Sequence, residues 1–262
     1  MGDGPFLRMR SLILSDIHGN LEALEAVLAS ARIDEEKYDA VWNLGDVVGY
    51  GGSPNEVTQI IRDRATAHVR GNHDKVCCGS ESGLGFNPIA RQAAQWTQKT
   101  LTEENSEWLR ALPQGPVVIE PFSSVIVHGS PIHEDTYIVN MRDAWAPLQQ
   151  MEQSMTFFGH THIQCGFAWK EGAWTEFRPR YATSSDAEQW TLDLAENTRY
   201  LLNPGSVGQP RDGDWRAAYA VLDNEANTVV YHRIPYDLAR SQGRILMAEL
   251  PERLASRLRE GR

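Results

Sequence analysis

The sequence predicts an α/β sandwich built on two β-sheets. In the first half of the chain, short apolar runs typical of buried strands alternate with segments whose apolar residues recur every three or four positions, as they do in helices. Beyond residue 165 the chain consists of strand-like pieces separated by turns. Alternating strand–helix–strand units followed by a β-rich half are typical of helices packed on sheets.

A strand, a helix and a second strand open the predicted fold. The run "RSLILSD" (10–16) is rich in leucine and isoleucine, which indicates a buried strand. In the next segment Asn20 is placed to cap a helix whose apolar residues share one face, namely Leu21, Leu24, Leu28 and Ala31. The run "AVWNLGD" (40–46) predicts the second strand.

Start signals mark the second helix, "SPNEVTQIIRD" (53–63). Ser53 is the predicted cap, Pro54 lies in the first turn, and Glu56 completes a capping box with Ser53. The third strand is predicted at "TAHVRGN" (66–72). Two helical patterns and then three strands follow, at 87–98, 102–111, 116–120, 124–130 and 155–160.

The last third is predicted to be mostly β-structure before a closing helix. A hairpin is predicted at 166–177, because Glu171 and Gly172 separate two strand-like runs. Residues 180–189 form the most polar stretch and predict a surface loop. Three strands and a closing helix complete the chain at 189–194, 216–223, 228–234 and 236–262, and the apolar residues of the helix include Leu238, Ile245, Leu246 and Leu250.

One domain and a cytoplasmic location are predicted. No internal repeat, low-complexity tract or long linker interrupts residues 1–262, and residues 1–8 are expected to be a flexible N-terminal extension. The N-terminal segment lacks the apolar core of a signal peptide, and no apolar run approaches membrane-spanning length. Three cysteines, of which Cys77 and Cys78 are adjacent, do not make a disulfide framework.

The charge balance argues against some partners. The chain carries 25 basic and 35 acidic residues, a net charge of −10. So acidic a chain, with no basic stripe, lacks the field expected of a protein that binds nucleic acid or anionic membranes. A nucleotide or phosphate ester held locally remains compatible with this charge. The oligomeric state cannot be read from the sequence.

The predicted strand ends carry an unusual concentration of His, Asp and Asn. Five of the eight histidines follow predicted strands directly, each near a glycine. Ligands of open α/β sheets bind beyond the carboxyl ends of the strands. Five strand ends therefore deliver one set of polar side chains to one rim, namely Asp16, His18, Asp46, Asn72, His73, Asp74, His128, His160 and His162.

Each of these motifs alone also fits an ordinary turn or strand end, since Gly, Asn and Asp favour turns for backbone reasons. If the backbone stays extended, Asp16 and His18, and likewise His160 and His162, point the same way, because side chains two apart share a face of a strand. Histidine nitrogens combined with carboxylate and amide oxygens, without a thiolate, suit manganese, iron, zinc or similar divalent ions.

Five motifs in this order resemble the calcineurin-like metallophosphoesterase superfamily, and most of all its compact prokaryotic members. They are "DIHGN", "GDVVGYG", "GNHD", "VHGS" and "GHTH", and the loop "NPGSVGQPRDGD" (203–214) is similar to one found in that subgroup. The resemblance spans residues 16–214, most of the chain. It implies a four-layer sandwich of two mixed β-sheets flanked by helices.

The resemblance also implies two adjacent metal sites. The first would be held by Asp16, His18, Asp46 and His162. The second would be held by Asp46, Asn72, His128 and His160, so that Asp46 bridges the two. Manganese is the favoured metal, with iron, zinc or nickel as alternatives.

The family mechanism uses two metals about 3.5–4 Å apart and a hydroxide that bridges them and attacks phosphorus in line. His73, which is not a ligand in this scheme, would stabilise the transition state or protonate the leaving oxygen, a task that suits an imidazole with the reference pKa of about 6.5. Its alternative role is that of a turn histidine held by Asp74.

The chain departs from the protein phosphatases of this superfamily, which have Gly-Asp-x-x-Asp-Arg-Gly where this chain has "GDVVGYG". Gly49 replaces the aspartate that orients the catalytic histidine, and Tyr50 replaces an arginine that grips phosphate. Both absences argue against a phosphoprotein substrate and leave open what orients His73. Arg211 is the candidate for phosphate contact, with an ordinary surface arginine as the equal alternative.

The predicted function is a metal-dependent phosphoesterase acting on a small phosphodiester or nucleotide-type ester. A dinucleoside polyphosphate hydrolase is the alternative enzyme. A non-catalytic scaffold, like the metallophosphoesterase-fold subunit of retromer, is the alternative of a different class, but that subunit lacks the catalytic histidine, whereas this chain has His73.

Overall fold

The computed structural model describes residues 9–32, 38–120 and 123–262, and its strands form two six-stranded sheets. The first sheet has the order β3–β2–β1–β11–β12–β9, that is Ala67–His68, Ala40–Asn43, Arg10–Leu14, Ala217–Asp223, Thr228–Ile234 and Glu188–Asp193. The second has the order β4–β5–β6–β10–β7–β8, that is Val117–Ile119, Ser124–Ile126, Met155–Phe157, Arg199–Asn203, Cys165–Lys170 and Ala173–Phe177.

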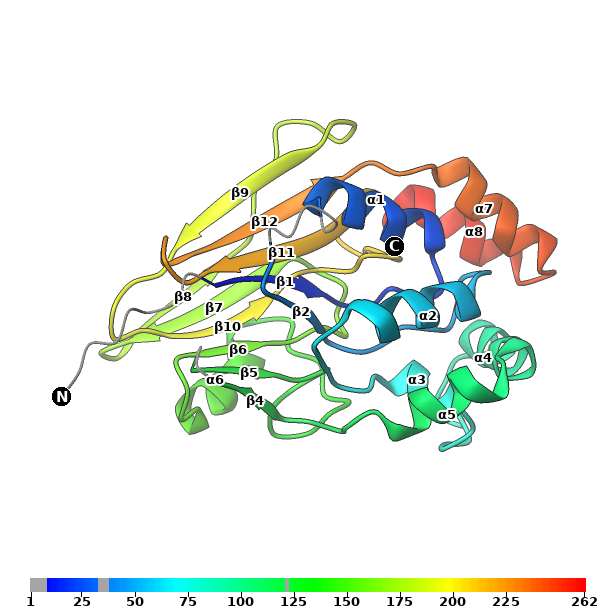
Figure 1. Ribbon diagram of the computed structural model, residues 1–262. Coiled ribbons are helices and arrows are strands. Elements are labelled where there is room, and N and C mark those ends of the chain that lie inside the picture. Colours follow the sequence, from blue (N-terminus) through cyan, green and yellow to red (C-terminus); the bar gives the residue numbers. More distant parts are fainter. Residues whose placement is uncertain (1–8, 33–37, 121–122) are drawn as a thin grey trace.

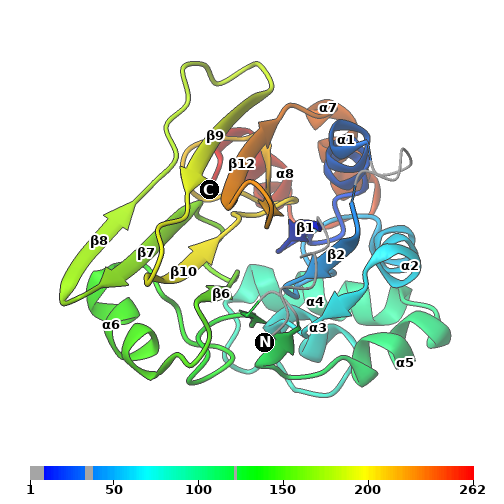
Figure 2. The ribbon, with the colours of Figure 1, turned by 60° about the vertical axis from the view of Figure 1, so that its left-hand side comes forward.

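Helices cover the outer faces of both sheets, which confirms the predicted four-layer sandwich (Figures 1 and 2). Helices α1 and α2 pack on the first sheet and α6 packs on the second. The other helices gather at one end of the sandwich, near the carboxyl ends of β1 and β2. From α1 to α8 the bounds are Leu21–Ala31, Pro54–Arg64, Asn72–Cys77, Pro88–Thr100, Glu103–Ala111, Met141–Gln150, Leu238–Met247 and Glu252–Glu260.

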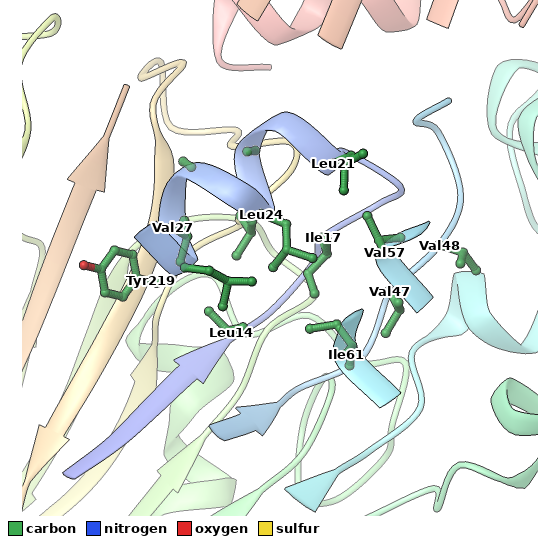
Figure 3. Packing of buried hydrophobic residues seen from close by; sticks show 14 of the residues in the cluster. Leu14, Ile17, Leu21, Leu24, Val27, Val47, Val48, Val57, Ile61 and Tyr219 are labelled. Atoms are coloured by element: carbon green, nitrogen blue, oxygen red, sulfur yellow. The ribbon is translucent and has the colours of Figure 1, made fainter. Parts of the chain in front are cut away.

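The side chains of β1 alternate between two apolar cores, one under the helices and one between the two sheets. Leu12 and Leu14 face the helices, whereas Ile13 faces the second sheet, because successive side chains of a strand point to opposite faces. Leu14 packs on α1 beside Leu24 and Val27 (Figure 3). The strand that carries the first candidate ligands is therefore buried on both faces, which holds its carboxyl end in place.

We expect Leu14→Ala to lower the free energy of unfolding by about 2–5 kcal/mol, because removing a fully buried side chain leaves a cavity. Urea unfolding followed by circular dichroism would measure the loss. Leu246→Ala is the matched control, since Leu246 is 50% exposed, and it should change stability by less than about 0.5 kcal/mol. Equal losses in the two variants would contradict this view of the core.

Ser53 is the N-cap residue of α2, as predicted, but the predicted capping box is wrong. The Ser53 hydroxyl makes no capping hydrogen bond and is buried without a partner among the described residues. Its N–H instead donates to the carbonyl oxygen of Gly19, and Glu56 is exposed to solvent. Because the N–H of Ser53 donates to Gly19, it does not donate to the Glu56 side chain, and the capping box does not form.

Other differences concern the extent of elements. The strand predicted at 66–72 is only Ala67–His68, because the chain enters α3 directly after Gly71. The single helix predicted at 236–262 is wrong: it consists of α7 and α8, which are separated at Pro251. Helices α3 and α6 and strand β10 were not predicted. The hairpin of β7 and β8 is confirmed.

Some predictions remain open. Residues 1–8, the predicted extension, lie outside the described residues. That residues 1–262 form a single domain stays a prediction. Within the described ranges, no helix is long and apolar enough to cross a membrane.

Candidate metal centre

The loops beyond β1, β2, β3, β5 and β6 bring together the seven side chains expected to be ligands. Their potential ligand atoms form two groups that could each hold a metal ion, Asp16, His18, Asp46 and His162 in the first and Asp46, His128 and His160 in the second. Asn72 joins the second group, since its Oδ1 lies 3.3 Å from Nε2 of His128. The six His and Asp residues are buried.

The backbone reaches this arrangement differently from the prediction. His160 and His162 were expected in an extended segment, with both rings facing one spot. Both residues instead have left-handed conformations, as do Asp16, His18 and Asp46, with φ between 49° and 66°. A non-glycine residue in this region costs about 1–3 kcal/mol, and such residues cluster at functional sites. The tight turns direct His160 and His162 to different groups.

Glycines allow the loops to approach one another. A Cβ atom on Gly71 would lie 2.0 Å from Oδ1 of Asp46, and one on Gly159 would lie 1.9 Å from Oγ of Ser15. Both distances are far shorter than a van der Waals contact. The glycines beside the candidate ligands are therefore required by close packing at these positions.

The first group has the hydrogen bonding of a cation site. Nδ1 of His18 lies 3.1 Å from the carbonyl oxygen of Val48, and Nδ1 of His162 lies 2.6 Å from that of Gln209. A carbonyl oxygen only accepts, so each Nδ1 carries the proton and each neutral ring presents a lone pair at Nε2. The two Nε2 atoms are 3.2 Å apart. Two facing lone pairs repel unless a cation lies between them, so the residues fit a metal.

The second group repeats this arrangement. Nδ1 of His128 lies 2.8 Å from the carbonyl oxygen of Leu44, and Nε2 of His160 lies 3.2 Å from that of Asp135. The other two ring nitrogens, Nε2 of His128 and Nδ1 of His160, are 3.1 Å apart. Backbone carbonyls thus fix the ring orientations in both groups, as they commonly do around metal-binding histidines.

Asp46 lies between the groups. Its Oδ2 is 3.5 Å from Nε2 of His18 and 3.5 Å from Nε2 of His128. Its Oδ1 accepts the backbone N–H of His73 at 2.8 Å. One carboxylate oxygen therefore faces both groups, which is the position required of a bridging ligand.

The electrostatics of the centre favour added positive charge. Burial raises the pKa of Asp16 to about 7. Burial acts to raise the pKa of Asp46 as well, but His128 and His73 hold it well below its usual range. Burial acts to lower the pKa of His128, but the charge and hydrogen bond of Asp46 raise it to about 10. Without a metal, the proton on His128 therefore supplies the positive charge that balances Asp46. A bound divalent cation would take over this role.

His73 lies beside the first group. Its ring centroid is 4.9 Å from that of His18, 4.3 Å from that of Tyr50 and 4.5 Å from that of Phe86. Burial lowers the pKa of His73 to about 4, so the reference value assumed from the sequence does not apply. Its Nδ1 is buried and has no hydrogen-bond partner among the described residues.

Neither Asp74 nor position 49 orients His73 through its side chain. The carboxylate of Asp74 accepts the backbone N–H groups of Asp46, Val48 and Gly71, so the alternative in which Asp74 holds the histidine is wrong. A Cβ on Gly49 would lie 2.5 Å from Nδ1 of His73. An aspartate at that position would require the ring to move. Packing against Tyr50 and Phe86 holds the ring instead.

Arg211 lies at the same centre. Its backbone N–H donates to the carbonyl oxygen of His162, and its guanidinium donates to Oε1 of Gln209 at 3.1 Å. Its positive charge opposes the rise that burial causes in the pKa of Asp16. These contacts place Arg211 beside the candidate ligands, and its role in phosphate binding stays a prediction. Gln209 and Asn203 form hydrogen bonds within the loops that hold His160 and His162.

Comparison with known proteins identifies the family. The sequence model of the calcineurin-like phosphoesterase superfamily domain matches residues 9–227. The chain belongs to the calcineurin-like phosphoesterase superfamily. The phosphoesterase is similar to the crystal structure of a metallophosphoesterase from Sphaerobacter thermophilus, with 40% identity, a TM-score of 0.81, and coverage of 97% of this chain and 99% of the other.

Two further relatives differ in how much they share with this phosphoesterase. An uncharacterized protein of Methanocaldococcus jannaschii is 34% identical over 258 residues, which are 95% of this chain and 97% of that protein. The symmetrical bis(5′-nucleosyl)-tetraphosphatase of Yersinia pestis is 30% identical over 107 residues, only 40% of this chain and 37% of that protein. The second likeness is therefore partial.

Sequence reasoning missed the support of His160. Lys75 of the phosphoesterase is buried and forms an ion pair with Asp135 at 2.8 Å and with Glu134 at 3.2 Å. Asp135 in turn receives the hydrogen bond of His160, and Tyr137 stacks on the His160 ring with centroids 3.9 Å apart. Nothing near Lys75 in the sequence indicates partners about 60 positions away, so no local signal was available.

We expect a divalent cation to displace at least one proton when it binds this phosphoesterase at pH 7. His128, with a pKa of about 10, is protonated before binding, and Asp16, with a pKa of about 7, is half protonated. Both must lose their protons to become ligands, so the apparent affinity should rise with pH up to about pH 10, the pKa of His128, and most steeply below about pH 7, the pKa of Asp16. Calorimetric titration with Mn²⁺ in two buffers of different ionisation enthalpy measures the protons released. Identical heats in both buffers would contradict the prediction.

Proposed function

We propose that this phosphoesterase binds two divalent metal ions and hydrolyses a small phosphodiester or nucleotide-type phosphate ester. The observation that carries the proposal is the placement of Asp46, one of whose oxygens lies 3.5 Å from a histidine of each ligand group. The proposed ligands are Asp16, His18, Asp46 and His162 for the first ion, and Asp46, Asn72, His128 and His160 for the second. Manganese is the favoured metal, because histidine, carboxylate and amide ligands without thiolate suit it, and iron, zinc and nickel are the alternatives.

Two bound divalent ions would supply Lewis acidity, which lowers the pKa of water and neutralises phosphate oxygens. The residues of the chain then act around that chemistry. The imidazole of His73, neutral at pH 7 because burial lowers its pKa to about 4, donates an N–H hydrogen bond to the phosphate or to the leaving oxygen. Arg211 binds the substrate through one of its phosphate oxygens. The His and Asp residues of the centre are buried, and burial strengthens these electrostatic interactions.

The second candidate is a dinucleoside polyphosphate hydrolase. It is favoured by the partial likeness to symmetrical bis(5′-nucleosyl)-tetraphosphatases over 107 residues. A non-catalytic scaffold is disfavoured, because His73 and every candidate ligand are present and grouped. The three free cysteines, all buried, support the proposed cytoplasmic location.

Hydrolysis of bis-p-nitrophenyl phosphate by the purified protein with added Mn²⁺ tests the proposal. Release of p-nitrophenol that depends on Mn²⁺ and disappears with a chelator is the expected result. A folded protein that hydrolyses neither this diester, p-nitrophenyl phosphate nor diadenosine tetraphosphate with any of the four metals would overturn it and favour the scaffold.

A further inference from the structure

A second arginine lies beside Arg211 at the candidate centre. Arg257, on α8, has its guanidinium carbon 5.8 Å from the centroid of the Tyr50 ring, and that of Arg211 is 5.9 Å from the same ring. The two residues are far apart in the sequence and come from different parts of the fold. Tyr50 thus carries two positive charges over one aromatic ring, an arrangement in which cation–π attraction partly offsets their repulsion.

The guanidinium of Arg211 is not neutralised by the protein. Among the described residues, no Asp or Glu side chain forms an ion pair with Arg211 or Arg257. Nε of Arg211 is buried and has no hydrogen-bond partner within the described chain. The guanidinium of Arg211 has side-chain hydrogen bonds to Gln209 and Tyr137, which are both uncharged. Nε of Arg257 donates at 2.6 Å to an oxygen of Arg262, the last residue of the sequence. A buried charged donor without a partner destabilises the fold, and an anionic ligand would satisfy it.

The Tyr50 ring connects this pair to the proposed reaction centre. Its centroid is 4.7 Å from that of His18 and 4.3 Å from that of His73. Tyr50 occupies the position at which the protein phosphatases of the superfamily have an arginine. In this chain Arg211 and Arg257, which come from later segments, approach that position. Two guanidinium groups thus lie where the protein phosphatases have one. In the proposed function, two divalent ions already neutralise the phosphate that is hydrolysed. That phosphate does not require the arginine pair in addition.

We propose that Arg211 and Arg257 bind a second phosphate group of the substrate, attached to the phosphate that is hydrolysed. The inference rests on the proposed function and narrows it to substrates of the nucleoside polyphosphate class. In the reaction, a bond forms between water oxygen and phosphorus, the phosphoanhydride P–O bond breaks, and the leaving phosphate oxygen takes up a proton. The second phosphate, held by the arginine pair, places that bond at the centre.

The test compares two substrates in the presence of Mn²⁺, diadenosine tetraphosphate and bis-p-nitrophenyl phosphate. For Arg257→Gln we expect kcat/KM to fall at least tenfold more for the tetraphosphate than for the diester, because only the tetraphosphate presents a second phosphate to a bidentate guanidinium. Arg257→Lys should restore part of the loss. The matched control is Arg253→Gln, since Arg253 is on the same helix but pairs with Glu260 in solvent.

Equal losses for the two substrates, or none for the tetraphosphate, would overturn the inference. Binding gives a readout that does not depend on turnover. In a His73→Ala background with Mn²⁺, calorimetric titration should show a Kd for diadenosine tetraphosphate at least tenfold higher after Arg257→Gln, and an unchanged Kd would reject the inference. A wild type that hydrolyses neither substrate would contradict the proposed function, whereas the binding comparison would still decide on the arginine pair.

Discussion

Asp46→Asn should lower kcat/KM for bis-p-nitrophenyl phosphate by about 10³-fold or more, the largest effect that we expect from one substitution in this chain. Oδ2 of Asp46 lies 3.5 Å from Nε2 of both His18 and His128, so the change removes negative charge from both proposed sites together. An asparagine can keep the contact between its carbonyl oxygen and the N–H of His73, which limits other disturbance. Its amide can also donate to the two histidines, which competes with a cation for the same lone pairs.

The measurement combines Mn²⁺-dependent release of p-nitrophenol with the metal content of the purified protein. Asp193→Asn is the matched control, because Asp193 is an exposed carboxylate on β9 and lies outside both ligand groups. Its activity and metal content should equal those of the wild type. An Asp46→Asn variant that binds two ions per chain and turns over at the wild-type rate would show that Asp46 does not bridge them.

The rim of the sandwich could be predicted from the sequence because strand ends are visible in it. Buried strands produce apolar runs, and each run that leads to the centre is followed closely by a histidine or an acid and by glycine. The structure shows why the glycines are there, since a Cβ on Gly71 would lie 2.0 Å from Oδ1 of Asp46. The strand ends therefore predicted one polar rim, and the resemblance to the metallophosphoesterases that these motifs carry supplied the division of the ligands into two groups.

Backbone conformation at the ligands could not be predicted in the same way. Positive φ is uncommon for residues other than glycine, yet His160 and His162 have φ of 66° and 60°. Contacts far away in the sequence impose these values, among them the hydrogen bonds from Nδ2 of Asn203 to Gly159 and Thr161. Local propensity carries no information about such contacts, and an extended segment was the natural but incorrect expectation.

Arg257 was missed for a related reason. It lies on a surface helix that was predicted as part of one long helix, and no motif surrounds it. Only the break at Pro251 lets α8 turn back so that Arg257 reaches Tyr50. Residues placed by tertiary packing rather than by a strand end leave no signal in a single sequence, and the same is true of Lys75 and Asp135.

His73→Ala should lower kcat by about 10²–10³-fold while leaving the affinity for Mn²⁺ unchanged, because His73 lies outside both ligand groups and acts on the phosphate. His68→Ala is the control, since this half-buried histidine at the end of β3 packs on Trp108 rather than at the centre. A loss of metal affinity in His73→Ala would show that the ring only supports the neighbouring ligands.

The choice of substrate separates the two roles that the sequence left open for His73. Burial lowers its pKa to about 4, so at pH 7 the neutral ring has an N–H to donate but no extra proton to transfer. We therefore expect similar losses for bis-p-nitrophenyl phosphate, whose leaving group needs no proton, and for 2′,3′-cyclic AMP, whose alkoxide leaving group does. A loss at least tenfold larger for the cyclic nucleotide would show that His73 is a general acid, which requires the bound phosphate to raise its pKa toward neutrality.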